Sequence, residues 1–283
     1  MQSSNYRGST SRQHNFRLQL GGTRDGRRDA LIFHMRNRTF SDVLVFQRFN
    51  IDPETGNVYV QGTQGLLSCF TADGKLLWQH SMMEEFGRLT FPNGRTGSLT
   101  TDGSLLYAKA ITANWGADGP ARSRYYAFEK LTGELVWSST PGTDPVDNPM
   151  GAPVFADLGG HRVFYLGTGC GHVVCINART GEPVWRFKLS NGGLNSDMLL
   201  DGPGRLIAIH GKENTDASSQ GRLVALKIPT EYPTGPKPVI LGKDAELWRN
   251  DSFSAFSSSP LLVNGKVYST SAVGEFQCAD AKT

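Results

Sequence analysis

The stretch VYVQGTQGLLSCFTADGKLLW at residues 58–78 decides the fold, because the same pattern recurs further along the chain. It returns as FYLGTGCGHVVCINARTGEPVW at residues 164–185 and as VYSTSAVGEFQCADAKT at residues 267–283. In each copy a tyrosine precedes a glycine by six residues, and that glycine precedes a cysteine by four. A pattern that recurs at intervals of about 40 to 60 residues indicates stacked copies of one supersecondary unit.

Two further copies keep the second half of the pattern. SRYYAFEKLTGELVW at residues 123–137 and GRLVAL at residues 221–226 have Ala127 and Ala225 where the other copies have cysteine. Each unit alternates apolar and polar residues between Gly, Asp, Asn or Pro, which is typical of strands joined by turns. We therefore expect an all-β fold, a β-propeller of four-stranded antiparallel blades, with four blades and a partial fifth in an incomplete ring. The next repeat residue after Thr283 would be the turn glycine, so we expect a fragment of a longer protein.

The first 49 residues differ from the repeats in composition. They hold nine Arg, no Lys and three Asp, which gives +6, whereas the remainder carries −3. We expect residues 1–49 to be an Arg-rich leader that is disordered or not native to the propeller, and residues 50–283 to be the partial propeller. An Arg-rich arm also suits nucleic acid or an acidic membrane, but no aromatic–basic interleaving accompanies it, so we expect no nucleic-acid partner. No apolar stretch approaches the roughly 18 residues of a membrane span, and no signal peptide is visible.

The strings TGELVW, TGEPVW and ADGKLLW resemble the repeat of pyrroloquinoline-quinone-type, or quinoprotein-like, β-propellers. The resemblance covers roughly residues 50–283. In that family a tryptophan closes each blade and packs against the next one, which implies structural, blade-docking roles for four residues. They are Trp78, Trp137, Trp185 and Trp248. The motif matches poorly at Trp248, where residues 226–248 form a stretched, Pro-rich excursion.

The resemblance implies a non-catalytic scaffold or binding module of a bacterial cell envelope, located in the periplasm and similar to the propeller lipoproteins of the outer-membrane barrel-assembly machinery. Its partner would be a protein or a small ligand. The alternative is a fragment of a quinone-dependent alcohol or sugar dehydrogenase. Those enzymes carry two adjacent cysteines over the quinone and a calcium site, and this chain has no Cys-Cys pair. We therefore favour a non-enzyme without a cofactor, and expect pyrroloquinoline quinone and calcium only under the alternative.

Cysteine and histidine give no catalytic or metal-site pattern. Cys69, Cys175 and Cys278 share one repeat position, so they lie in different blades and are expected to be small buried residues. A disulfide between Cys170 and Cys175 remains the alternative. The string GTGCGH resembles a phosphate loop, but a strand follows it instead of the helix that such a loop needs. His172 is then expected at a solvated turn, and no His or Cys falls at a metal-ligand spacing.

Two insertions lengthen the hairpin between the second and third strands in copies two and four, so we expect both on one face of the ring. Loops on a rigid scaffold are where function concentrates. The predicted binding residues are Asn114, Trp115, Asp118 and Arg122 in the first insertion and Lys212, Glu213 and Asp216 in the second. Trp115 is either an anchor for a ligand or partner, or a plug that packs against a neighbouring blade.

Overall fold

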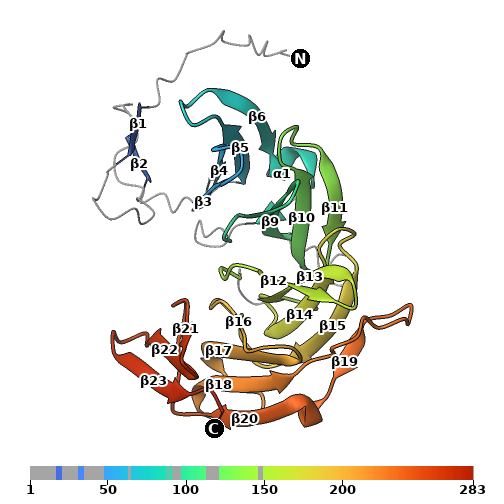
Figure 1. The fold of residues 1–283 in the computed structure, drawn as a ribbon, viewed down its shortest axis with the longest axis vertical. Coiled ribbons are helices and arrows are strands. Elements are labelled where there is room, and N and C mark those ends of the chain that lie inside the picture. The colour runs from blue at the N-terminus through green and yellow to red at the C-terminus, as the bar shows by residue number, and fades with distance from the viewer. Residues whose placement is uncertain are drawn as a thin grey trace, which may run out of the picture.

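The chain folds almost wholly into antiparallel β-sheets that follow one another along an open arc (Figure 1). The structure, a computed structural model, describes residues 17–20, 31–34, 48–62, 65–87, 89–90, 97–112, 121–145 and 149–282. Within these ranges the one α-helix, α1 (Met82–Glu85), has four residues, and a single 3-10 helix, η2 (Lys243–Ala245), has three. The predicted all-β propeller of four-stranded blades in an incomplete ring is confirmed.

Each blade begins with a strand on the inside of the arc and ends with a strand on its outside (Figure 1). Blade 1 consists of β3 (Arg48–Ile51), β4 (Val58–Gln61), β5 (Leu66–Phe70) and β6 (Leu76–Ser81). Blade 2 consists of β8 (Thr100–Asp102), β9 (Leu105–Thr112), β10 (Ser123–Glu129) and β11 (Leu135–Ser139), with β7 (Leu89–Thr90) also paired to β9. Blade 3 consists of β12 (Val154–Leu158), β13 (His161–Gly167), β14 (His172–Asn177) and β15 (Pro183–Lys188).

Blade 4 repeats the same order, and a three-stranded sheet follows it. Blade 4 consists of β16 (Leu199–Leu200), β17 (Arg205–Glu213), β18 (Gln220–Lys227) and β20 (Glu246–Asn250). The last sheet, blade 5, consists of β21 (Leu261–Val263), β22 (Lys266–Thr270) and β23 (Phe276–Asp280). A separate two-stranded sheet joins β1 (Arg17–Leu20) and β2 (Leu31–His34), and most of the predicted leader lies outside the described residues.

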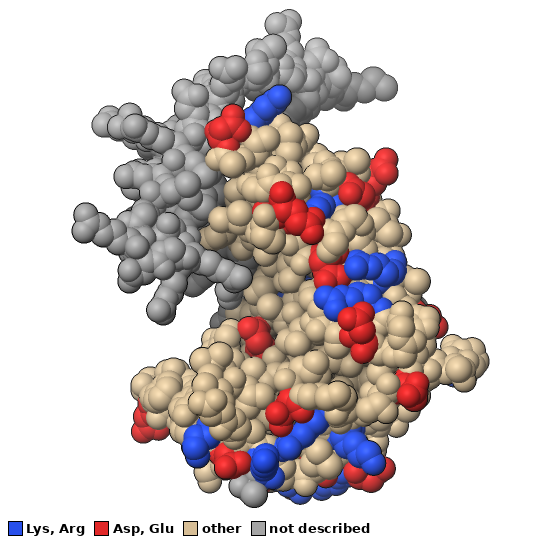
Figure 2. Space-filling view, viewed as in Figure 1, with Lys and Arg blue, Asp and Glu red and all other residues tan. Residues whose placement is uncertain are grey.

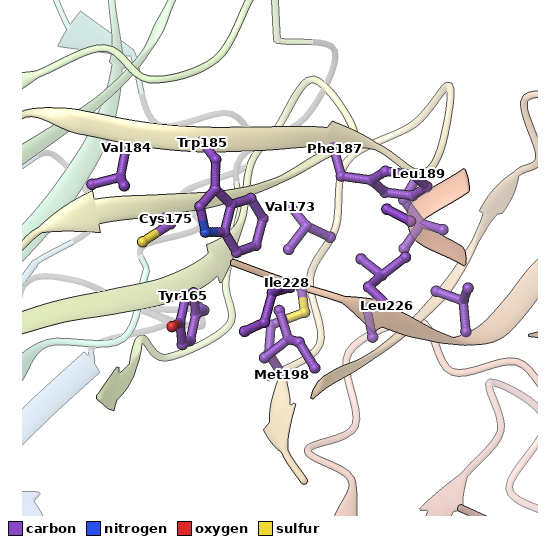
Figure 3. Close-up of a cluster of buried hydrophobic side chains, with 14 of the residues drawn as sticks. Tyr165, Val173, Cys175, Val184, Trp185, Phe187, Leu189, Met198, Leu226 and Ile228 are labelled. Atoms are coloured by element: carbon purple, nitrogen blue, oxygen red, sulfur yellow. The ribbon is translucent and has the colours of Figure 1, made fainter. Parts of the chain in front are cut away.

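The core is divided into four apolar clusters, one between each pair of neighbouring blades. The cluster between blades 3 and 4 shows the arrangement: Cys175 and Trp185 of blade 3 pack with Leu226 of blade 4 (Figure 3). The repeat position that holds Cys or Ala faces the following blade, and a small side chain there lets the two sheets approach. Each blade thus buries its apolar face only by stacking on a neighbour.

The outer-strand tryptophans hydrogen-bond to the backbone of the following blade. Trp78 Nε1 donates to the Lys130 carbonyl at 3.1 Å, and Trp137 Nε1 donates to the Ala178 carbonyl at the same distance. Trp248 Nε1 donates to the Ala281 carbonyl, also at 3.1 Å. Because Lys130, Ala178 and Ala281 occupy one repeat position, these are three copies of one contact between blades.

This contact between blades explains why the repeat has a glycine in its Thr-Gly turn. The indole of Trp78 lies against Gly133 of the following blade, and a Cβ on that glycine would come 2.7 Å from the ring. Gly181 receives Trp137 in the same way, at 2.6 Å. Both glycines have a positive φ, at 81° and 77°, so any other residue would strain the turn as well as displace the ring.

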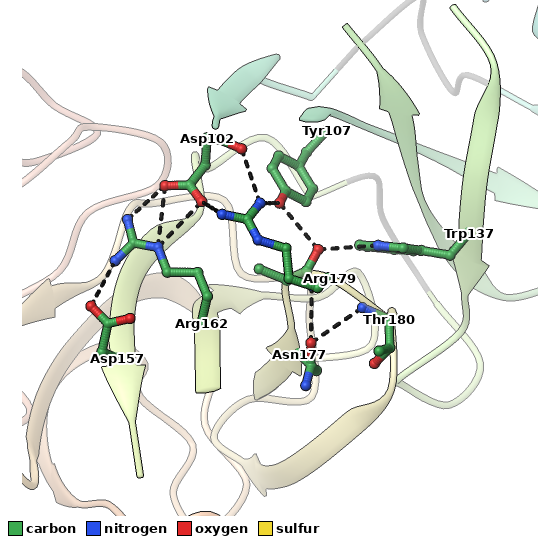
Figure 4. Close-up of polar contacts among 9 residues, drawn as sticks. Asp102, Tyr107, Trp137, Asp157, Arg162, Asn177, Arg179 and Thr180 are labelled. Carbon is green, nitrogen blue, oxygen red and sulfur yellow. Dashed lines mark hydrogen bonds and ion pairs between the residues drawn. The ribbon is translucent and has the colours of Figure 1, made fainter. Parts of the chain in front are cut away.

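An ionic contact supports the same junction between blades 2 and 3 (Figure 4). Asp102, at the end of β8, accepts hydrogen bonds from Arg162 Nη2 at 2.6 Å and from Arg179 Nη2 at 2.8 Å. Burial opposes ionisation of Asp102, but the neighbouring Arg162 and Arg179 guanidiniums outweigh it and hold the pKa of this carboxyl below its usual value. Between blades 1 and 2, Lys130 pairs with Asp52 at 3.0 Å.

Blade 3 departs from the pattern at its outer edge. The Pro-rich excursion of residues 226–248 provides a fifth strand, β19 (Val239–Leu241), which pairs in parallel with β15. Blade 4 therefore lacks the turn glycine that would receive Trp185. The indole of Trp185 is fully buried, and its Nε1 has no hydrogen-bond partner among the described residues.

The prediction that the three repeat cysteines are buried is right for Cys69 and Cys175 and wrong for Cys278. Cys69 and Cys175 are 0% exposed, whereas Cys278 is exposed. Cys278 and Phe276, which is 75% exposed, lie on the face of blade 5 that corresponds to the face covered by the next blade elsewhere. All four cysteines are free thiols, so the alternative of a disulfide between Cys170 and Cys175 is also wrong.

Replacing Trp137 by Ala is expected to lower the free energy of unfolding by about 3–5 kcal/mol, because it empties a buried site between blades 2 and 3. Trp137→Phe keeps an aromatic ring beside Phe164 but removes the bond to the Ala178 carbonyl and part of the ring volume. That carbonyl still accepts the Tyr107 hydroxyl at 3.1 Å, so this variant should lose less than Trp137→Ala, about 1–2 kcal/mol. Urea unfolding measures both values, and equal losses in the two variants would contradict this account.

Candidate binding surface on the hairpin face

The loops between the second and third strands of the blades share one rim of the arc, which we call the hairpin face. It carries the β9–β10, β13–β14 and β17–β18 hairpins, together with the connections that leave the outer strands. The two predicted insertions join equivalent strands, β9 to β10 and β17 to β18. The ends of β9 and β10, between which the first insertion lies in the sequence, are thus on the same side of the molecule as the second insertion.

The first insertion is described only at its C-terminal foot. Asn114, Trp115 and Asp118 lie outside the described residues. Arg122 lies directly before β10, where its backbone N–H donates to Thr112 Oγ1 at 2.8 Å. Its guanidinium forms an ion pair with Asp144, in the connection that follows β11. This pair ties the foot of the insertion to the connection of its own blade.

The hairpin of blade 3 contains a thiol–imidazole pair that the sequence analysis missed. Cys170 Sγ lies 3.2 Å from His172 Nδ1 and 3.0 Å from Thr168 Oγ1, and it accepts the Thr143 N–H at 3.2 Å. Burial opposes ionisation of Cys170, but the contacts with His172, Thr168 and Thr143 outweigh it and lower the pKa of the thiol to about 6. His172 is 9% exposed, so the prediction of a solvated turn is wrong.

The second insertion is held by the connection that leaves blade 3. The Glu213 carbonyl accepts Ser190 Oγ at 2.9 Å and the Asn191 N–H at 2.9 Å. Ser190 in turn rests on the blade 3 hairpin, because its N–H donates to the Gly171 carbonyl at 3.0 Å. On the other side, Lys212 Nζ lies 4.7 Å from the centre of the Phe256 ring, over its face. The insertion therefore has a fixed backbone with contacts on two sides.

Asp216 is the charged centre of the second insertion. Its carboxylate accepts Arg222 Nη2 at 2.8 Å, Lys243 Nζ at 2.7 Å and Arg249 Nη1 at 2.7 Å. The hydrogen bonds from Lys243, Arg249 and Arg222, in that order, hold the pKa of this carboxyl well below its usual range. Arg222 is nearly fully buried and also donates to Asp251 at 2.5 Å. Asp216 is thus an ionised, fully partnered group.

A pocket of about 310 Å³ opens beside Asp216, between the outer edge of blade 3 and the second insertion. Its apolar walls are formed by Phe187, Leu189 and Leu241. Its charged lining includes Asp216 and Lys243. Figure 2 shows Lys and Arg side chains lying beside Asp and Glu side chains over the surface of the arc. Sequence reasoning missed this pocket because β19 and η2, far from the insertion in the chain, complete it.

His210 lies under the second insertion and is 1% exposed. Its Nδ1 accepts the Lys212 N–H at 3.3 Å, which leaves the proton of the neutral ring on Nε2. Burial first, and then the positive charge of Arg222, lower the pKa of His210 to about 4. The neutral ring is therefore part of the native packing below the hairpin.

Within the described ranges, no three His, Cys, Asp or Glu side chains come close enough together to hold a metal ion. No helix within them has the length and apolar character to cross a membrane.

The pH dependence of stability should report on His210. In the unfolded chain a histidine takes up a proton near pH 6.5, whereas folded His210 does so only near pH 4. The unfolded state binds more protons between these values, so the contribution of His210 is complete above pH 6.5 and is lost as pH falls to 4. It amounts to about 3 kcal/mol at most. Urea unfolding at several pH values should give a curve for His210→Gln that falls less steeply than that of the original chain. Parallel curves between pH 7 and pH 4 would contradict this.

Comparison with known proteins identifies the family. A family model described as outer membrane protein assembly factor BamB matches residues 53–283. Among curated proteins, the chain is similar to a quinoprotein ethanol dehydrogenase of Pseudomonas aeruginosa, with 27% identity over 224 residues. That alignment covers 72% of this chain and 33% of the enzyme, so the chain spans about a third of the length of that relative.

Two solved structures show the same fold at low identity. A quinohemoprotein alcohol dehydrogenase from Pseudomonas putida has a TM-score of 0.50 and 14% identity, over 81% of this chain and 39% of that one. Sqt1 from Chaetomium thermophilum, bound to the N-terminus of a ribosomal protein, has a TM-score of 0.54 and 11% identity, over 94% of this chain and 66% of that one. The predicted resemblance to quinone-type propellers is confirmed. Because the family model spans most of its length, the chain belongs to the family of the outer membrane protein assembly factor BamB.

Proposed function

We propose that this chain is a non-catalytic scaffold or binding module of a bacterial cell envelope, and that its hairpin face holds a protein partner. The observation that carries the proposal is the second insertion. Its backbone is fixed to blade 3 through the Glu213 carbonyl, and it stands beside a pocket with apolar walls and a charged part. A surface that is already ordered binds with a smaller loss of conformational entropy.

The chemistry of the pocket suits an anchor side chain from a protein. Phe187, Leu189 and Leu241 offer apolar contact, while Asp216 and Lys243 offer both signs of charge. Interfaces commonly combine a buried apolar anchor with a polar rim of this kind. The three cations around Asp216 are balanced by three carboxylates, because Arg222 also pairs with Asp251 and Arg249 also pairs with Glu246. A partner therefore needs to bring no compensating charge of its own.

The family supports a periplasmic, envelope-associated partner. The family model is described as an outer membrane protein assembly factor. We extend that role to this chain as part of the proposal. The partner would then be a component of the outer-membrane protein assembly machinery. The first insertion, with Asn114, Trp115, Asp118 and Arg122, would widen the surface on the blade 2 side.

Trp115→Ala is the first variant to test. If Trp115 anchors the partner, binding to the purified periplasmic part of the assembly machinery should weaken by about 2 kcal/mol, or roughly thirtyfold in Kd, with an unchanged melting temperature. Biolayer interferometry measures the Kd. Glu182→Ala is the matched control, because Glu182 is exposed in the β14–β15 turn on the opposite rim and should leave the Kd unchanged.

Two outcomes would contradict the proposal. If the original chain shows no saturable binding, the hairpin face is not the partner site. If Trp115→Ala lowers the melting temperature and leaves the Kd unchanged, Trp115 is a plug between blades and does not belong to the binding surface.

A quinone-dependent dehydrogenase is the second candidate, favoured by the similarity to the quinoprotein ethanol dehydrogenase. Calcium prefers several oxygen ligands, with carboxylates among them. Two carboxylates near the hairpin face are already engaged by cations, since Asp144 pairs with Arg122 and Asp216 pairs with three cations. Their pairing disfavours both as calcium ligands and so supports the scaffold over the dehydrogenase.

Titration of the chain with pyrroloquinoline quinone and calcium is accordingly expected to give no saturable absorbance change and no dye reduction with an alcohol substrate. The expectation follows from the pairing of the candidate carboxylates. Binding in the micromolar range or tighter would favour the dehydrogenase over the scaffold.

A further inference from the structure

The outer edge of blade 3 shows how an extended segment covers a blade of this protein. β19 pairs in parallel with β15, with Trp185 opposite Val239 and Phe187 opposite Leu241. The residue before the blade tryptophan, Val184, is only 4% exposed and belongs to the core cluster that also takes in Leu241. The added strand thus turns an edge position into a core position.

The same position is exposed in the other blades that end in a tryptophan. Leu77 is 43% exposed, Val136 is 50% exposed and Leu247 is 51% exposed. Among the described residues, no strand pairs with the outer edges of β6, β11 or β20. Each of these edges offers backbone donors and acceptors beside an apolar side chain.

The three open edges differ in charge. β20 carries Glu246 and Arg249, which form an ion pair at 3.0 Å. β6 has no Asp, Glu, Lys or Arg of its own, but Glu85 of α1 lies beside it and contacts His80 Nδ1 at 2.6 Å and the Ser81 N–H at 2.9 Å. Charged side chains on or beside an edge strand discourage pairing with other chains. β11 has the sequence LVWSS, with no charged residue and no proline, and Leu131 and Leu135 beside it are 53% and 42% exposed.

We propose that β11 is a docking edge for an extended, apolar, uncharged segment of a partner protein, which adds to it in parallel as β19 adds to β15. Val239, Ile240 and Leu241 define the chemistry of that segment. Pairing of the segment with Trp137, Ser138 and Ser139 would supply the backbone hydrogen bonds, and an apolar side chain would cover Val136. This surface is on the outer rim and is separate from the hairpin face, so it does not depend on the proposed function.

The chain's own sequence supplies the probe. A labelled peptide of residues 238–242, PVILG, contains β19 without the flanking lysines, and its proline favours an extended backbone. Fluorescence anisotropy with the full chain should show saturable binding. Val136→Lys should weaken it at least tenfold, because a charge replaces the apolar contact, and Val136→Thr should weaken it less. Leu247→Lys, the equivalent change on the charged edge of β20, should leave the affinity within twofold of the original.

Melting temperatures of all variants test whether they fold. Because Val136 and Leu247 are half-exposed, the substitutions should not prevent folding. The absence of saturable binding would overturn the proposal. An equal loss of affinity in Leu247→Lys would also overturn it, because the effect would then not be specific to β11. An unchanged affinity in Val136→Lys would overturn it as well, because the peptide would then be replacing β19 on β15. A peptide with an N-methyl group on Ile240 that binds as well as the unmodified one would show that backbone pairing is not involved. A dimer that dissociates in Val136→Lys, measured by light scattering, would identify a second copy as the occupant and overturn the assignment to a partner.

Discussion

The hydrogen bond from an outer-strand indole to a backbone carbonyl of the following blade is the contact on which the rest of this structure depends. It occurs from Trp78, Trp137 and Trp248, each time at 3.1 Å and at the same repeat position. Trp78 and Trp137 each have a glycine of the following blade beneath the indole, and every four-stranded blade has a small residue at the Cys or Ala position, where the next sheet packs. Once these conditions recur at a fixed spacing, every blade takes the same orientation, and every second-to-third-strand hairpin emerges on one rim.

Trp185 shows what happens when one condition is missing. Blade 4 replaces the Thr-Gly turn with a Pro-rich excursion, so Trp185 loses both its glycine and its hydrogen-bond acceptor. The excursion compensates by adding β19 to β15, which leaves Trp185 fully buried and stacked on Tyr165 with ring centres 5.5 Å apart. The same excursion brings Leu241 and Lys243 to the hairpin of blade 4 and so completes the pocket. The departure from the repeat and the candidate site therefore have one cause.

The sequence predicts the repeated part of this molecule well, because strand period, turn glycines and tryptophans are local signals with a fixed spacing. It is less informative where distant segments meet. Nothing in the sequence VIL at residues 239–241 indicates that it pairs in parallel with β15. Asp216 could be predicted as a polar residue of an insertion, but its contacts with Lys243 and Arg249 could not. The burial of His172 depends on Cys170 and on the connection from blade 2. Cys278 was predicted to be buried because a repeat position implies a following blade, and no described residue covers it.

Asp216 and His210, at the second insertion, are held in fixed protonation states. A catalytic carboxylate or imidazole works best with a pKa near the working pH. Asp216 is held ionised by three cations, and burial keeps His210 neutral down to a pKa of about 4, so neither changes protonation near neutral pH. Their fixed states instead stabilise the hairpin: Asp216 ties β18, β20 and η2 together, and His210 anchors the backbone at Lys212. A surface whose charges are committed to its own rigidity offers shape and apolar contact, and this supports the proposal that the second insertion binds a partner.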